Sequence, residues 1–212
     1  MLNNQNLNNM ADTKSIRGTR TERNIVASYL NESAAYTRYN YYAKQATKES
    51  LFPIAQVFTA TSENEFIHSK VFFKMLQGGQ VTVDVTPDAG IIGTTAQNLQ
   101  LSMAEELKEG VDAYVQAAEV AREEGFPEIA VHFESIAKIE KHHHDRFERY
   151  LDMLNNGTLW KRDKPILWQC LVCGYIFEGT EPPKVCPACD HPYQHYMALD
   201  DYNEIVLPEI TV

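Results

Sequence analysis

The sequence lacks any long apolar run, which argues against a membrane-spanning helix. Such a helix needs about 20 consecutive apolar residues, and no stretch of this 212-residue chain approaches that length. The first residues, Met1 to Lys14, are rich in asparagine and have no apolar segment of the kind that a secretory signal contains. We therefore expect residues 1–14 to be a disordered leader, and the protein to be cytoplasmic with no membrane partner.

Basic residues are scarce relative to acidic ones, and the formal net charge at pH 7 is −10. Because the phosphates of nucleic acids would be repelled, we expect no nucleic-acid partner. Several glutamates fall where a core residue is expected, so part of the acidic excess is available to neutralise bound metal.

Glycine and proline are few between residues 15 and 155, where apolar residues recur at helical steps of three and four. This spacing predicts four helices, with the first two and the last two joined by short links as antiparallel hairpins. They cover about residues 21–47, 53–77, 94–125 and 127–155.

The connection over residues 79–93 is long enough to cross the bundle, as in ferritin-like folds. We predict an all-α four-helix bundle over residues 15–156, a linker over 157–165 and a small C-terminal module, mainly β-strand and loop, over 166–212.

Each predicted helix places a glutamate where its apolar seam requires a core residue. The first seam runs through Ile25, Tyr29, Glu32, Tyr36, Tyr39 and Ala43. The third runs through Leu99, Met103, Glu106, Gly110, Ala113, Ala117 and Val120, with Glu109 beside it. The second and fourth seams carry the i, i+3 pairs Glu65–His68 and Glu140–His143.

Several buried carboxylates at one level of a bundle repel one another unless a counter-charge is present. No lysine or arginine is expected in the seams near this level, so a pair of metal cations is the simplest counter-charge. One glutamate from each of two helices plus Glu-x-x-His from each of the other two is the ligand set of di-iron carboxylate bundles. We predict that seven residues bind the metals: Glu32, Glu65, His68, Glu106, Glu109, Glu140 and His143.

An internal repeat supports this interpretation. Glu65 follows Glu32 by 33 residues, and Glu140 follows Glu106 by 34, so the two hairpins resemble copies of one unit. A single Glu-x-x-His motif more often lies on a solvated face, but two matched motifs favour a dinuclear site. Tyr39 and Tyr114 lie near this level, where they either pack in the core or hydrogen-bond to the ligands.

Cysteine is absent from the first 169 residues, and four cysteines then follow in two Cys-x-x-Cys pairs: Cys170, Cys173, Cys186 and Cys189. In a cytoplasmic protein this pattern indicates a tetrahedral thiolate site for zinc or iron rather than disulfides. Zinc would stabilise so small a module, but the adjacent redox-capable site favours one iron. We expect the metal to be surrounded by Trp168, Tyr175, Phe177 and Tyr196.

Taken together, these motifs resemble those of the rubrerythrin family from about residue 14 onward. The matching stretches are 14–22, 38–42, 65–68, 89–92, 121–125, 140–143 and 170–189. The chain departs from the family in its asparagine-rich leader. It departs from free rubredoxins in Asp190, where they have glycine, and in a shorter gap between the cysteine pairs.

The resemblance implies a peroxidase of oxidative-stress defence that reduces hydrogen peroxide to water at a di-iron site. Electrons would pass through the rubredoxin-like iron from an NAD(P)H-linked reductase or a free rubredoxin. It also implies a homodimer with one subunit's module near the partner's di-iron site, and Glu109 and His68 as exchangeable ligands of one iron. The alternatives are a ferroxidase or storage protein, a non-catalytic electron carrier or zinc-stabilised scaffold, and an oxidase that uses oxygen.

Overall fold

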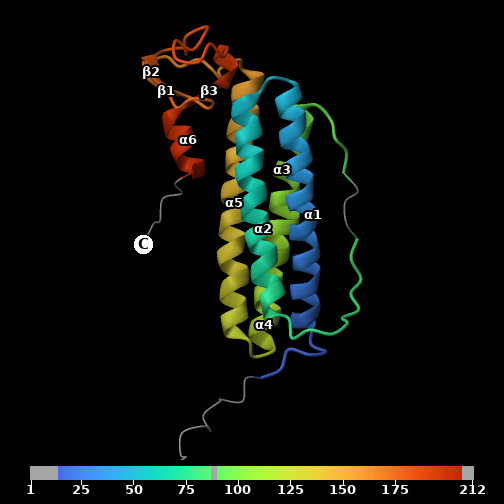
Figure 1. Ribbon diagram of the computed structural model, residues 1–212. Helices are drawn as coiled ribbons and strands as arrows, with labels where there is room; N and C mark the ends of the chain where they lie inside the picture. The colour runs from blue at the N-terminus through green and yellow to red at the C-terminus, as the bar shows by residue number, and fades with distance from the viewer. Residues whose placement is uncertain (1–13, 87–89, 207–212) are drawn as a thin grey trace, which may run out of the picture.

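The computed structural model describes residues 14–86 and 90–206, except for the side chains of Glu109 and Val206, and contains a long helical bundle with a small module at one end (Figure 1). Three bundle positions are single helices: α1 (Arg20–Lys48), α2 (Phe52–Met75) and α5 (Pro127–Asn155). The fourth is shared by α3 (Thr95–Glu105), the π-helical segment η1 (Glu106–Asp112) and α4 (Ala113–Glu123). The predicted four-helix architecture is confirmed; most of the predicted leader, residues 1–13, lies outside the described residues.

The helices begin at residues whose side chains or rings suit a helix N-terminus. The Thr19 hydroxyl accepts a hydrogen bond from the backbone N–H of Glu22 at the start of α1. Thr94 and Gln97 form a reciprocal capping box at the start of α3. Proline occupies the first turn of α2 and of α5, where its missing N–H costs no hydrogen bond.

The connection from α2 to α3 leaves one end of the bundle and reaches α3 at the other, and its described parts, residues 76–86 and 90–94, lie on the outside of the bundle (Figure 1). As a result α2 and the α3–η1–α4 segment run in one direction, and α1 and α5 run in the other. The predicted crossover is therefore present.

Two apolar clusters fill the bundle, and the glutamate-bearing level lies between them. One includes Tyr39, Phe58 and Phe147; the other includes Phe72 and Phe133. Burying such a side chain contributes roughly 1.5–3 kcal/mol. Apolar packing on both sides therefore offsets the cost of placing carboxylates between the clusters.

The π-helical segment corrects the predicted third seam. Four residues of this segment, each four positions after the last, are all buried: Ser102, Glu106, Gly110 and Tyr114. A regular helix of 3.6 residues per turn cannot keep residues at three successive steps of four on one face. The wider π-turn absorbs the extra residue. Consequently Ala113, predicted in the seam, is exposed, and Tyr114 is buried in its place.

A second correction concerns Tyr36, which was predicted in the first seam but is 39% exposed. Its ring packs on Phe66 of α2 on the outer surface, with the ring centroids 5.7 Å apart. The buried positions of α1 run instead through Glu32, Tyr39 and Ala43, and Tyr36 lies beside that face.

The C-terminal module contains β1 (Ile166–Cys170), β2 (Ile176–Gly179), the short 3₁₀ turn η2 (Tyr193–His195), β3 (Tyr196–Ala198) and α6 (Leu199–Val206). Its strands form an antiparallel sheet in the order β2-β1-β3. Trp168 and Tyr196 are fully buried as predicted, but Tyr175 is 38% exposed, which corrects its predicted place around the metal.

The module packs against the bundle. Met197 of β3 and Leu159, from the predicted linker, join the apolar cluster that contains Tyr39. The Arg149 guanidinium of α5 lies 2.6 Å from the Glu204 carboxylate of α6. Among the described residues, no helix combines the length and the apolar character that crossing a bilayer requires.

Candidate metal centres

The structure gathers six of the seven predicted ligands into two overlapping groups in the middle of the bundle. One group contains Glu32, Glu65, His68 and Glu140, and the other contains Glu65, Glu106, Glu140 and His143. Glu65 and Glu140 belong to both groups, which is what two carboxylates bridging a pair of cations would require. The seventh predicted ligand, Glu109, has its side chain outside the described part of the structure.

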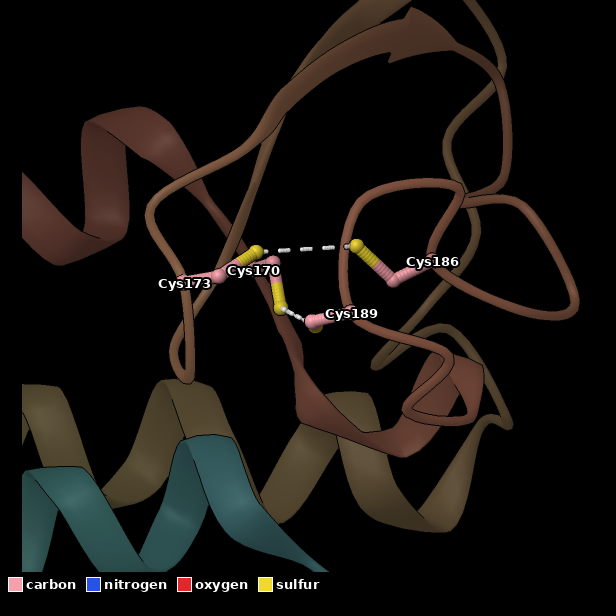
Figure 2. Close-up of side chains that lie close together, drawn as sticks. All are labelled: Cys170, Cys173, Cys186 and Cys189. Atoms are coloured by element: carbon pink, nitrogen blue, oxygen red, sulfur yellow. Dashed lines mark hydrogen bonds between the residues drawn. The ribbon is translucent and has the colours of Figure 1, made fainter.

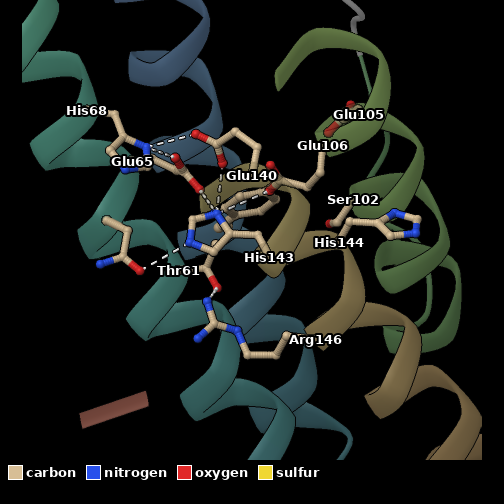
Figure 3. A network of polar contacts seen from close by, with 12 residues as sticks. Thr61, Glu65, His68, Ser102, Glu105, Glu106, Glu140, His143, His144 and Arg146 are labelled. Atoms are coloured by element: carbon tan, nitrogen blue, oxygen red, sulfur yellow. Dashed lines mark hydrogen bonds and ion pairs between the residues drawn. The ribbon is translucent and has the colours of Figure 1, made fainter. Parts of the chain in front are cut away.

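The spacing of the ligand atoms fits metal coordination (Figure 3). His68 Nδ1 lies 2.9 Å from Glu65 Oε2 and 3.0 Å from Glu140 Oε1. His143 Nδ1 lies 2.9 Å from Glu140 Oε2 and 3.0 Å from Glu65 Oε1. Metal bonds of about 2.1 Å at right angles would separate neighbouring ligand atoms by about 3.0 Å.

Hydrogen bonding alone leaves this cluster incomplete. Glu65 Oε1 and Glu140 Oε1 are buried, and each shares a histidine Nδ1, 3.0 Å away, with a second carboxylate oxygen that lies 2.9 Å from the same nitrogen. One Nδ1–H cannot fully satisfy two buried carboxylate oxygens, and an incompletely satisfied buried carboxylate is costly. A pair of hard or borderline cations would satisfy both oxygens, so the donor set fits the di-iron group.

Two tyrosines hold the outer glutamates in a reciprocal arrangement. The Tyr39 hydroxyl on α1 donates to Glu106 Oε1 at 2.5 Å, and the Tyr114 hydroxyl on α4 donates to Glu32 Oε1. Burial, followed by the charges of the neighbouring glutamates, raises the pKa of each phenol well above its usual value. Both phenols therefore keep their protons at neutral pH and remain donors.

When no metal is bound, protons offset part of the negative charge of the carboxylate cluster. Burial, and then repulsion from Glu140 and Glu65, raises the pKa of Glu32 and Glu106 well above the usual value. Burial alone would lower the pKa of His68, but its hydrogen bonds to Glu140, Glu32 and Glu65 raise it well above the usual value. At neutral pH the metal-free folded protein thus binds protons that the unfolded chain releases.

We therefore predict that the metal-free protein loses stability as the pH rises from about 5.5 to 8. Groups with raised pKa values (Glu32, Glu106, His68) favour the folded state below their unfolded pKa and lose that contribution as pH rises. Glu65 and Glu140 have lowered pKa values, so they are ionised in both states throughout this window. Urea unfolding of metal-free protein, followed by helical circular dichroism, measures the slope; a free energy of unfolding that rises with pH would contradict the assignment.

Gly110 allows η1 to approach α5 at the site. A Cβ added at Gly110 would lie 2.6 Å from both Cβ and Cγ of Glu140. We predict that Gly110→Ala destabilises the protein by about 1–3 kcal/mol and lowers its iron content, because it displaces a ligand shared by both groups. Denaturant unfolding and iron analysis test this, with Ala113→Ser at an exposed position of α4 as the control; unchanged iron would show that Glu140 is not displaced.

Arg146 corrects the expectation that no cation lies in the seams near this level. It follows His143 by one helical turn, is 5% exposed, and donates from Nη2 to Thr61 Oγ1 at 3.0 Å (Figure 3).

Two histidines at this level have further polar partners: His143 Nε2 lies 3.2 Å from Asn64 Oδ1, and His144 Nδ1 lies 3.0 Å from the Met103 carbonyl. A partner on the second ring nitrogen fixes the orientation of a ligating histidine.

All four cysteine sulfurs converge in the C-terminal module (Figure 2). Cys170 Sγ lies 3.8 Å from Cys189 Sγ, and Cys173 Sγ lies 3.7 Å from Cys186 Sγ. A tetrahedron with metal–sulfur bonds of about 2.3 Å has edges of about 3.8 Å. The sulfurs are therefore spaced for one tetrahedral metal ion and are too far apart for a disulfide.

The two cysteine knuckles share one backbone pattern. The Gly174 N–H donates to the Cys170 carbonyl at 2.9 Å, and the Asp190 N–H donates to the Cys186 carbonyl at 3.0 Å. Gly174 has φ +77°, and Asp190 has φ +58°. Aspartate is one of the few residues besides glycine that visits this left-handed region, so Asp190 preserves the knuckle at the position where free rubredoxins have glycine.

Comparison with known proteins agrees with this pair of sites. The rubrerythrin family model matches residues 23–151, and the rubredoxin-like domain model of rubrerythrin matches residues 168–197. The chain is 43% identical to rubrerythrin of Porphyromonas gingivalis, covering 86% of this chain and 92% of that protein. It is 41% identical to rubrerythrin of Nitratidesulfovibrio vulgaris, covering 88% and 97%.

Solved structures show the same architecture. Nigerythrin in a mixed-valence state aligns with a TM-score of 0.58 at 26% identity, covering 89% of this chain and 90% of that one. Bacterioferritin of Mycobacterium tuberculosis aligns with a TM-score of 0.56 at 19% identity, covering 64% and 86%; this likeness concerns the fold alone.

Fold and sites together define a class: a ferritin-like bundle with a di-iron carboxylate site, joined to a rubredoxin-like module with a four-cysteine metal site. The chain belongs to the rubrerythrin family, whose members are oxidoreductases. The resemblance found in the sequence is thereby confirmed.

Proposed function

We propose that the protein is a peroxidase that reduces hydrogen peroxide to water in the defence of the cytoplasm against oxidative stress. The observation that carries this proposal is the buried cluster in which two ligand groups share Glu65 and Glu140. We assign the di-iron ligands as Glu32, Glu65, His68, Glu106, Glu109, Glu140 and His143. Two ferrous ions held there would supply the two electrons that cleave the oxygen–oxygen bond.

Side chains around the carboxylate cluster hold the predicted metal ligands in position. The hydroxyls of Tyr39 and Tyr114 hold Glu106 and Glu32 in place. The two apolar clusters on either side limit the entry of water. Reduction of one peroxide consumes two electrons and two protons and yields two water molecules. Carboxylates change denticity easily, so they tolerate the change in metal charge that accompanies electron transfer.

Electrons are proposed to enter through the cysteine site. A one-electron iron in a closed tetrahedron of thiolates has no open position, so it relays electrons and does not bind peroxide. The donor is proposed to be a free rubredoxin or an NAD(P)H-linked reductase. We propose that residues 15–156 form the domain that reduces peroxide and residues 166–212 the domain that transfers electrons. Residues 157–165 form the linker between them.

A homodimer would shorten the electron path. Along α5 alone, the rise from the level of His143 to Asn155 is about 18 Å at 1.5 Å per residue, and the module that contains the cysteines lies at that end of the bundle (Figure 1). We propose that the module of one subunit serves the carboxylate site of its partner. The exposed rings of Phe66 and Phe73 on α2 provide apolar surface that such an assembly can cover.

The main alternative is a ferroxidase, because a ferroxidase could use the same buried carboxylate cluster. Reaction preference separates the two functions. The anaerobically reduced protein is mixed in turn with hydrogen peroxide and with oxygenated buffer, and the rate of iron oxidation is followed. Faster oxidation by peroxide, at one peroxide per two electrons, supports the peroxidase. Faster oxidation by oxygen, with ferrous iron taken up and retained beyond the two sites, supports the ferroxidase.

A further inference from the structure

A small cavity adjoins the carboxylate cluster on the side away from the histidines. Its volume is about 30 Å³, room for one or two water-sized molecules and hence for hydrogen peroxide. Its inner wall is formed by buried residues, among them Glu32, Glu106 and the two tyrosines Tyr39 and Tyr114. Neither His68 nor His143 lines it. A molecule that reaches the ligand oxygens through this cavity must therefore first pass its outer wall.

The outer wall is formed by side chains that retain some solvent exposure. Among them, Arg38 of α1 and Glu105 of α3 form an ion pair, with Nη2 and Oε2 2.9 Å apart. Their side chains are 16% and 11% exposed. This pair joins the two helices across the outer side of the cavity, one residue before Tyr39 on α1 and one before Glu106 on the other helix.

The pair is not explained by stability alone. Desolvation of a partly buried ion pair offsets most of its Coulomb energy. In addition, Arg38 Nε is buried without a hydrogen-bond partner among the described residues. An unsatisfied buried donor is costly, and in the wall of a cavity it can be satisfied by a small oxygen-containing guest.

We propose that Arg38, held by Glu105, is the specificity-determining residue of the entrance: it admits hydrogen peroxide, to which its free Nε–H can donate, and obstructs hydroperoxides with an organic group. The inference rests on the proposed peroxidase function and adds the residue that selects its substrate. A cavity of about 30 Å³ is too small for an alkyl or aryl group, so Arg38 and Glu105 in its outer wall would have to move to admit one.

The test compares the iron-loaded wild type with Arg38→Ala and Arg38→Gln. Stopped-flow rate constants are measured for reoxidation of the reduced protein by hydrogen peroxide and by cumene hydroperoxide. The preference for hydrogen peroxide is expected to fall by about tenfold or more in Arg38→Ala. Arg122→Ala, which breaks the exposed ion pair with Glu134, is the matched control and should retain the wild-type preference.

A second readout does not depend on turnover: the rate at which 2,2′-bipyridine extracts ferrous iron from the carboxylate site. Extraction should be faster in both Arg38 variants and unchanged in Arg122→Ala. Iron content and circular dichroism confirm that each variant is folded and loaded; if Arg38→Ala is not, Arg38→Gln, which keeps more of the side chain, carries the test.

The outcomes separate the two claims. If the wild type reacts with neither hydroperoxide, the proposed peroxidase function fails, and the extraction rates alone decide whether Arg38 controls entry. If the wild type reduces hydrogen peroxide but the Arg38 variants keep its preference, the specificity role of Arg38 is overturned.

Discussion

Replacing Glu65 with glutamine is expected to remove both irons of the carboxylate site and to abolish peroxide reduction. Glu65 belongs to both ligand groups, and its two oxygens lie 2.9 Å from His68 Nδ1 and 3.0 Å from His143 Nδ1. The neutral amide of glutamine cannot bridge two cations as a carboxylate does. The loss should exceed the roughly 10–100-fold effect of removing a partner outside the coordination sphere.

The measurement is iron analysis together with single-turnover reoxidation by peroxide. Glu63→Gln provides the matched control, because Glu63 is exposed on the same helix two residues earlier. Glu32→Gln should give an intermediate result, since Glu32 belongs to only one group. A Glu65→Gln protein that still holds two irons outside the cysteine site would show that Glu65 is not a shared ligand.

Replacing Cys186 with serine is expected to stop donor-driven turnover while sparing the carboxylate site. Cys186 is fully buried, and serine is a poorer ligand for this site than a thiolate. Turnover with a rubredoxin-type donor should fall by about 100-fold or more. A chemically reduced sample should still be reoxidised by peroxide at the wild-type rate in a single turnover. Val185→Ser, at the adjacent exposed position, is the control.

Mixing the two inactive proteins tests the relay between subunits. In a heterodimer of Cys186→Ser and Glu65→Gln chains, an intact module belongs to one subunit and an intact carboxylate site to the other. Recovery of donor-driven turnover after the subunits are exchanged would support the proposed path across the dimer. If exchange is complete and no activity returns, electrons move within one chain and the proposed path is wrong.

The sequence predicts which candidate ligands come together because their spacing is a property of single helices. Glu65–His68 and Glu140–His143 share a helical face whatever the rest of the fold does, and the matched intervals place the pairs at one level. The geometry of each Cys-x-x-Cys pair is also set locally, because the backbone of each knuckle is ordered by its own hydrogen bonds. Identities of this kind can be predicted without knowledge of tertiary structure.

The predictions that the structure corrects depend on irregular geometry or on contacts between helices. Ala113 is placed wrongly because a regular helix is assumed where a π-turn is present; the repeated step of four from Ser102 to Tyr114 is the signal that could have revealed it. Arg146 is missed although it follows His143 by three residues, because a cation is not expected in an apolar seam. The pairing of Arg38 with Glu105 joins distant parts of the chain and leaves no local pattern.

The most direct test of the whole account is an anaerobic titration of the reduced protein with hydrogen peroxide, followed by the visible absorption of the thiolate-bound iron. We predict that this colour, bleached on reduction, returns rapidly and in proportion to the peroxide added, because the cysteine site feeds electrons to the carboxylate site. Failure of the colour to return, or a cysteine site that holds zinc and never shows it, would contradict the relay and direct attention to ferroxidase chemistry.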